Sequence, residues 1–142
     1  MTGDPELREI LSYPTVAVVG CSPKESRPSH AVALYLRNAG YRVIPVNPGF
    51  SEILGEKCYP NLLQIPEKVY VVDVFRRSEE VLPIVRDAVR IGAKAVWLQD
   101  GVAHPAAEEE ARRAGLKVVS NDCMMREHRR LGGPGRKTVT TC

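Results

Sequence analysis

The chain has 142 residues and a formal net charge of +3, with 44% of its residues hydrophobic and 26% charged. These values are typical of a single soluble globular domain with a core of its own. The small charge, the lack of a Lys/Arg block and the scattered aromatic residues (one Trp, five Tyr and two Phe) argue against a nucleic-acid partner.

Five short apolar runs alternate with segments of helical pattern. A short leading helix is expected within residues 1–14, and β-branched runs follow at residues 16–20, 42–46, 69–73, 93–98 and 116–119. Runs that are nearly continuous, rather than alternating with polar residues, are typical of strands covered on both faces.

The segments between these runs carry helix signals. After the first strand, Pro28 begins a helix that ends at Gly40. After the third strand, Ser78 is expected to cap a helix that stops at Gly92. A third helix ends at Gly115, and a last one is expected over about residues 122–131. Residues 47–68 are irregular and predict one or two short helical turns, and residues 132–142 predict a flexible tail rich in Gly and Pro.

The alternation of strands and helices indicates βαβ units with right-handed crossovers. We predict an α/β fold, in which residues 15–131 form one Rossmann-like doubly wound domain with a five-stranded parallel sheet flanked by helices. In such a sheet, ligands bind beyond the carboxyl ends of the strands, so the segments that follow the strands are the places to search.

The cysteines and the apolar runs indicate the compartment. The four cysteines show no CxxC spacing, and the first ten residues are charged rather than apolar. No run approaches the roughly 18–20 apolar residues of a membrane span. We therefore expect a cytoplasmic protein with reduced thiols, without a metal site and without membrane contact.

The loop after the first strand begins like a dinucleotide-binding turn but lacks its glycines. After Gly20, the fingerprint requires two further glycines at positions that hold Ser22 and Glu25. A ribose-binding carboxylate is also missing, because no Asp or Glu occurs between Asn38 and Ser51. Both observations count against NAD.

The same loops carry several cations. Lys24 and Arg27 surround the expected start of a helix, together with the hydroxyls of Ser22 and Ser29. Arg76 and Arg77 follow the third strand at the same edge of the sheet. Because a helix N-terminus favours anions, this set predicts a ligand with several phosphate charges.

Four stretches, "GCSPKESRPS", "PVNP", "VDVFRR" and "GAKAVWLQDGV", together resemble the small stand-alone CoA-binding proteins. Their domain is similar to the N-terminal CoA-binding domain of the succinyl-CoA synthetase alpha subunit and of NDP-forming acyl-CoA synthetases. The resemblance covers about residues 15–131 and implies that the ligand is coenzyme A or an acyl-CoA.

The resemblance also implies a role for particular positions. The turn that wraps the CoA phosphates corresponds to Gly20, Cys21, Ser22 and Pro23, with added charge and hydrogen bonds from Lys24, Arg27 and Ser29. The adenosine half would lie near Asn47 and Pro48. Further contacts would come from Phe75, Arg76, Arg77, Leu98, Gln99, Asp100 and Gly101, and Asn121 and Cys123 match a Pro-Asn-Cys stretch of the synthetases.

Two function classes remain open. The synthetases ligate through a phosphohistidine on a separate domain, and none of the three histidines here lies in that motif. This favours a binding or sensing module that serves a partner enzyme or acts as a homo-oligomer. The alternative is an NAD(P)- or thiol-dependent redox enzyme using Cys21, whose place at an expected helix start would lower its pKa. Asp73 and Asp100 end strands and are expected to cap the following loops rather than to catalyse.

Overall fold

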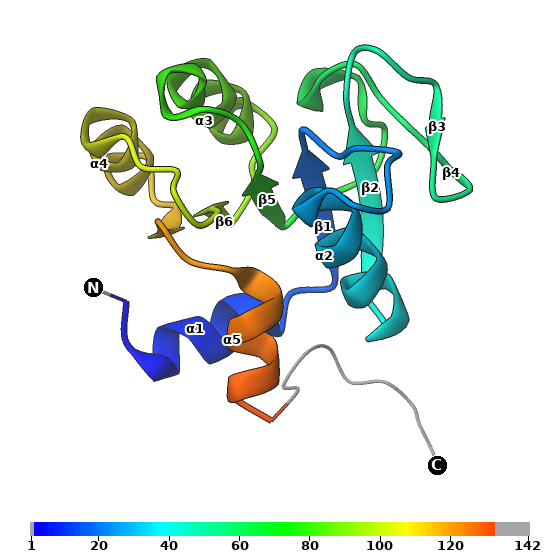
Figure 1. Ribbon diagram of the computed structural model, residues 1–142. Helices are drawn as coiled ribbons and strands as arrows, with labels where there is room; N and C mark the ends of the chain where they lie inside the picture. Colours follow the sequence, from blue (N-terminus) through cyan, green and yellow to red (C-terminus); the bar gives the residue numbers. More distant parts are fainter. Residues whose placement is uncertain (1, 133–142) are drawn as a thin grey trace.

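The computed structural model describes residues 2–132, which fold around a parallel sheet. Its strands lie in the order β2-β1-β5-β6-β7 (Figure 1). Their bounds are β1 Thr15–Val19, β2 Arg42–Val46, β5 Val71–Val74, β6 Ala95–Leu98 and β7 Lys117–Val119. The predicted α/β class with a five-stranded parallel sheet is confirmed, and the predicted strand ends differ from these by at most two residues. The expected tail at residues 132–142 lies, apart from residue 132, outside the described residues.

Helices cover both faces of the sheet. One face carries α1 Asp4–Leu11, α2 Pro28–Asn38 and α5 Met124–Arg130, and the other carries α3 Val81–Arg90 and α4 Pro105–Arg113 (Figure 1). The alternation of side chains along β1 follows these layers. Val16 and Val18 pack into the first core, whereas Ala17 and Val19 pack into the second. Both faces of the strand are therefore buried, as its continuous apolar run predicts.

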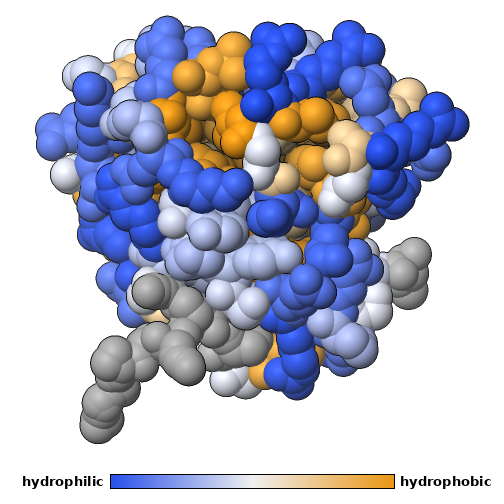
Figure 2. Space-filling view, turned by 180° about the vertical axis from the view of Figure 1, so that it is seen from behind, coloured by the Kyte–Doolittle hydropathy of each residue, from blue (hydrophilic) through white to orange (hydrophobic). Residues whose placement is uncertain are grey.

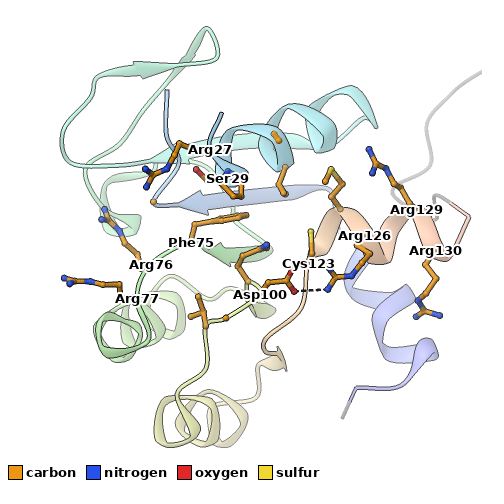
Figure 3. A pocket seen from close by; sticks show the side chains of 18 residues that line it. Arg27, Ser29, Phe75, Arg76, Arg77, Asp100, Cys123, Arg126, Arg129 and Arg130 are labelled. Atoms are coloured by element: carbon orange, nitrogen blue, oxygen red, sulfur yellow. Dashed lines mark hydrogen bonds and ion pairs between the residues drawn. The ribbon is translucent and has the colours of Figure 1, made fainter. Parts of the chain in front are cut away.

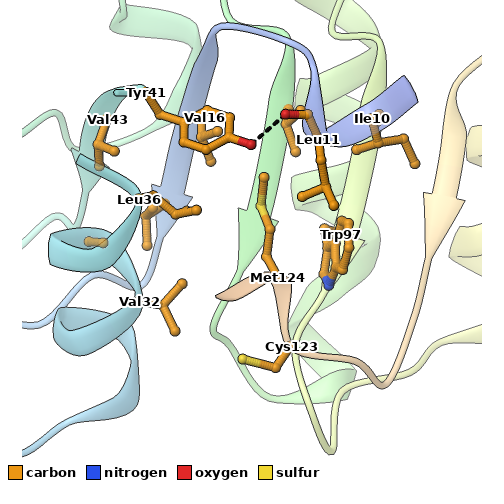
Figure 4. Packing of buried hydrophobic residues seen from close by; sticks show 14 of the residues in the cluster. Ile10, Leu11, Val16, Val32, Leu36, Tyr41, Val43, Trp97, Cys123 and Met124 are labelled. Carbon is orange, nitrogen blue, oxygen red and sulfur yellow. Dashed lines mark hydrogen bonds between the residues drawn. The ribbon is translucent and has the colours of Figure 1, made fainter. Parts of the chain in front are cut away.

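The core under α1, α2 and α5 is built around Trp97 (Figure 4). This indole is fully buried, and its Nε1 donates to the carbonyl oxygen of Asp122 at 3.0 Å. Leu11 of α1 lies in the same cluster, and its carbonyl oxygen accepts a hydrogen bond from the Tyr41 hydroxyl. The leading helix is thus packed into the core of the sheet.

The segment at residues 47–68 differs from the prediction. It contains the expected helical turn, η1 Leu62–Gln64, but also an antiparallel hairpin of β3 Glu52–Ile53 and β4 Glu56–Lys57. Leu54 and Gly55 join the two strands with φ angles of 58° and 73°. A two-residue turn of this kind usually contains Asn-Gly or Asp-Gly, so the leucine concealed the hairpin.

Ser78 also differs from its predicted role. It opens a 3₁₀ turn, η2 Ser78–Glu80, directly before α3, and its side chain caps neither element. Its hydroxyl instead accepts a hydrogen bond from the backbone N–H of Ala103 at 3.1 Å. Ser78 therefore joins the loop after β5 to the loop after β6 at the carboxyl edge of the sheet.

Candidate functional site

The strand order places the site at the carboxyl edge between β1 and β5. The chain leaves β1 toward α2 on one face and leaves β5 toward α3 on the other, so the two loops diverge at this point. Such a switch point leaves a crevice in doubly wound folds. A cleft of about 1150 Å³ opens there, slightly above the roughly 300–1,000 Å³ range of small-molecule pockets.

Gly20 directly follows β1 and lines this cleft. Its φ angle of 87° is one that residues with a side chain rarely adopt, and a Cβ atom there would strike the carbonyl oxygen of Phe75. The loops after β1 and β5 are therefore packed backbone to backbone. The glycine lets the neighbouring loop approach this turn closely.

The loop after Gly20 leads into α2 through hydrogen bonds to serine hydroxyls. The N–H of Ser22 donates to the Ser29 hydroxyl at 2.9 Å, and the N–H of Lys24 donates to the Ser22 hydroxyl at 3.1 Å. α2 starts after Arg27, and no side chain caps its first turn. The positive end of the helix dipole consequently faces the cleft without a capping acceptor.

Nine of the sixteen predicted ligand contacts line this cleft. They are Gly20, Arg27, Ser29, Phe75, Arg76, Arg77, Gln99, Asp100 and Gly101. The remaining predicted residues are not part of its lining: Cys21 and Leu98 are fully buried, and Pro48 lines a second cavity. Ser22, Pro23, Lys24 and Asn47 shape the surrounding loops without lining the cleft.

The arginines of the cleft fall into two groups. Arg27 and Arg76 form no ion pair and no side-chain hydrogen bond with any described residue. Arg77 is neutralised, since it pairs with Glu80 at 2.7 Å and lies 3.7 Å from Glu79. Arg27 and Arg76 are therefore the two cations at this end of the cleft that remain available to an anionic ligand (Figure 3).

The sequence reasoning missed the contribution of α5. Arg126, Arg129 and Arg130 line the opposite end of the cleft (Figure 3). Their i, i+3, i+4 spacing places them on one side of a helix, which is the signal that would have found them. Arg126 binds Asp100 at 2.8 Å, and its hydrogen bonds lower the pKa of that carboxyl. Asp100 thus pairs across the cleft with α5, and the prediction that it caps its own loop was wrong.

Cys21 is not the activated thiol that its sequence position suggests. α2 begins only at Pro28, so the thiol is not at the helix start. It is fully buried, and burial, with smaller effects of Cys58 and Asp73, raises its pKa to about 12. A thiol with a raised pKa is a poor nucleophile at neutral pH. This observation removes the support for redox chemistry at Cys21.

Asp73 is buried inside the sheet rather than placed at its edge. Neither carboxyl oxygen has a hydrogen-bond partner among the described residues, and the side chain has no exposed surface. Burial raises its pKa well above the usual value. The prediction that Asp73 caps the following loop was therefore wrong. The side chain also does not line the cleft.

A second cavity of about 510 Å³ lies beside the first, at the carboxyl ends of β1 and β2. Its walls include Pro48, Leu62 and Ile84, and Arg76 lines both cavities. In the view from behind, apolar surface gathers in a hollow that hydrophilic side chains border (Figure 2). The two cavities therefore adjoin at Arg76.

Two buried amide oxygens in this site have no partner among the described residues. Gln99 lines the first cleft with 8% of its surface exposed, and its Oε1 is a buried acceptor without a donor. Asn61 lines the second cavity, and its Oδ1 is in the same situation. Because unpaired buried acceptors are costly, both atoms favour a ligand that supplies N–H or O–H donors.

Residues 2–132 contain no group of three or more His, Cys, Asp or Glu side chains that could hold a metal ion. None of the helices in this part of the chain has the length and apolar character needed to cross a bilayer. His128 instead bonds through Nδ1 to the Tyr35 hydroxyl at 2.7 Å.

This chain is similar to known proteins in both sequence and structure. A family model described as a CoA binding domain matches residues 14–129. The uncharacterized protein YneT of Bacillus subtilis is 35% identical over 124 residues, which cover 87% of this chain and 92% of YneT. The ADP-forming acetate–CoA ligase I of Archaeoglobus fulgidus is 33% identical over 127 residues, and the match covers 82% of this chain but only 18% of the ligase. The solved structure of a hypothetical protein from Pyrococcus horikoshii is 46% identical, has a TM-score of 0.89 and aligns over 92% of both chains.

Proposed function

The chain belongs to the family of CoA-binding domains, and from this premise we propose that it binds coenzyme A or an acyl-CoA at the carboxyl edge of its sheet. The observation that carries the proposal is the presence of Arg27 and Arg76 at the switch point, without any ion pair among the described residues. Guanidinium groups bind phosphate through paired, charge-assisted hydrogen bonds. A ligand with a diphosphate and a further phosphate matches these two unpaired charges.

The two cavities suit the two halves of such a ligand. The adenine ring is a flat, largely apolar group that fits between Pro48, Leu62 and Ile84, with the buried Asn61 oxygen as an acceptor for its amino group. The ribose 3′-phosphate then lies at Arg76, which lines both cavities, and the diphosphate lies at Arg27 and the first turn of α2.

The pantetheine arm continues into the larger cleft. It carries two amide groups on an otherwise apolar chain, and this cleft offers the same combination. Val32 and Val102 provide apolar contacts, and the unpaired Gln99 oxygen accepts an amide N–H. The thiol end is then directed along α2 toward α5.

We propose that the chain acts as a binding or sensing module that holds CoA or acyl-CoA for a partner. Its similarity to YneT over 92% of that protein supports a function that needs no ligase domain. The match to the Archaeoglobus ligase covers only 18% of that enzyme, so most of the ligase lies outside the matched segment. The buried Cys21 thiol gives no support to the redox alternative.

Calorimetric titration of the purified protein with CoA, dephospho-CoA, acetyl-CoA, NAD and ATP tests the proposal. We expect micromolar binding of CoA that weakens about tenfold for dephospho-CoA, which lacks the 3′-phosphate. Arg76→Gln should remove this difference between the two ligands. Arg27→Gln should weaken both ligands by the same factor, because both contain the diphosphate.

Arg90→Gln is the matched control. Arg90 is an exposed arginine in the last turn of α3 that lines neither cavity, so its substitution should leave the CoA affinity unchanged. Binding of NAD or ATP without binding of CoA would refute the proposal. Equal effects of the Arg27, Arg76 and Arg90 substitutions would show that the switch point is not the phosphate site.

A further inference from the structure

The three arginines that α5 contributes to the cleft differ in what neutralises them. Arg126 bonds to Asp100 and Asp122, each at 2.8 Å. Arg130 bonds to Asp4 at 2.7 Å and to Glu127 at 2.6 Å. Arg129 has neither an ion pair nor a side-chain hydrogen bond with any residue in the described part of the chain. It is therefore a third available cation of the cleft, besides Arg27 and Arg76.

A cation–π contact with Tyr35 holds Arg129 in place. Its guanidinium carbon lies 4.9 Å from the centre of the Tyr35 ring, and the Tyr35 hydroxyl is bonded to His128 at 2.7 Å. A cation–π contact uses no hydrogen-bond acceptor, so the N–H donors of the guanidinium remain available to another partner. Arg129 is thus oriented by the protein without its hydrogen-bonding capacity being used.

This cation lies far from the other two. Tyr35 follows Arg27 by eight residues along α2, which corresponds to about 12 Å of helix. Figure 3 shows Arg27 and Arg76 at one end of the cleft and Arg129 at the other. Val32, Cys123 and Met125 give the stretch between them apolar contacts, and the ion pair of Asp100 with Arg126 lies in the same stretch. The cleft consequently has two ends with available cations, and the passage between them combines apolar side chains with charges that are already paired.

Building on the proposed function, we infer that the natural ligand is an acyl-CoA whose acyl chain ends in a carboxylate, and that Arg129 binds this carboxylate. The phosphates occupy the end with Arg27 and Arg76, and the pantetheine arm follows the passage along α2. The acyl group attached to its sulfur then emerges at the α5 end. A terminal carboxylate meets the unused donors of Arg129 there, whereas a methyl group would leave them without a partner.

Two stable thioethers test the inference without hydrolysis during the titration. S-(3-carboxypropyl)-CoA and S-butyl-CoA have the same number of carbons on sulfur and differ in one terminal carboxylate. At low salt, we expect the carboxylate form to bind the unchanged protein about five- to tenfold more tightly. In Arg129→Gln this ratio should fall to about one, while the affinity for S-butyl-CoA is retained. Arg90→Gln is the control, because this exposed arginine of α3 lines neither cavity, and it should keep the ratio.

Each other result has a definite meaning. Equal affinities of the two thioethers for the unchanged protein would overturn the inference but leave the proposed function intact. A preference that persists in Arg129→Gln would overturn the role of this arginine. Loss of the difference between CoA and dephospho-CoA in Arg129→Gln would show that it binds the 3′-phosphate, and the ligand would then lie in the opposite direction. Failure of all CoA derivatives to bind would refute the proposed function itself.

Discussion

Replacing the buried Asp73 by Asn should change how the stability of the protein depends on pH. Asp73 lies in β5 between Val18 of β1 and Trp97 of β6, and both of its carboxyl oxygens lack partners among the described residues. Burial without a compensating donor disfavours the ionised form, so the pKa of the folded state is raised well above the usual 3.8. The unfolded chain keeps the ordinary value.

The sign of the effect follows from this difference. Between pH 3.8 and the raised pKa, the folded state binds more protons than the unfolded state, so the free energy of unfolding falls as the pH rises. The slope for one carboxyl group is about 1.4 kcal/mol per pH unit. The loss ends above the pKa of the folded state. An asparagine side chain cannot ionise, so the Asp73→Asn variant should lack this contribution while keeping a side chain of nearly the same shape.

Urea denaturation of both proteins at pH 4, 5, 6, 7 and 8 measures the difference. We expect similar free energies of unfolding at pH 4 and an advantage of Asp73→Asn that grows by about 1.4 kcal/mol per pH unit until the pH reaches the pKa of Asp73 in the folded state. Glu25→Gln, which removes an exposed carboxylate, is the control and should follow the unchanged protein. Parallel curves for Asp73→Asn and the unchanged protein would show that Asp73 is ionised in the folded state over this pH range and that its pKa is not raised.

Two further substitutions test the loop after β1. Gly20→Ala should lower the free energy of unfolding by about 1–3 kcal/mol, because its Cβ would strike the Phe75 carbonyl at a positive φ; unchanged urea unfolding would contradict this close contact. Cys21→Ser should change the dissociation constant for CoA by less than about twofold. In the unchanged protein, Cys21 should resist alkylation by iodoacetamide at pH 8, because the thiol is buried and burial raises its pKa to about 12. Peptide mass spectrometry measures the alkylation. Rapid alkylation of Cys21 in the folded protein would restore the redox alternative.

The part of the fold that the sequence predicts well rests on burial of both faces of the sheet. A strand such as β1, with every residue buried, needs an uninterrupted apolar run, and that run is visible in the sequence without any knowledge of its neighbours. The hairpin at Leu54 depends instead on a turn in which a leucine adopts a positive φ, with its carbonyl oxygen held by the Arg37 guanidinium of α2. That contact exists only in the folded protein, so no local sequence pattern predicts the hairpin.

In the candidate site, too, some features follow from the local sequence and others depend on contacts in the folded protein. Strand ends predict which loops gather at one edge, and this was sufficient to place Arg27 and Arg76 together. Which of the arginines are neutralised depends on contacts between distant residues, such as Arg126 with Asp100 and Arg130 with Asp4. Asp73 shows that a strand-end position alone does not identify a site residue. Its place in the sequence resembles that of a catalytic carboxylate, but its side chain is buried within the sheet.

Ion pairing also explains why a net charge of only +3 is compatible with a polyanionic ligand. The charge that a ligand meets is local, and it depends on which cations of the cleft lack a carboxylate partner. Arg77, Arg126 and Arg130 contribute little to this field because their partners lie within 2.8 Å. Arg27, Arg76 and Arg129 have no such partner among the described residues. The field is therefore concentrated at the positions where the phosphates and the proposed acyl carboxylate would bind, and CoA affinity should fall as salt rises although the protein as a whole is nearly neutral.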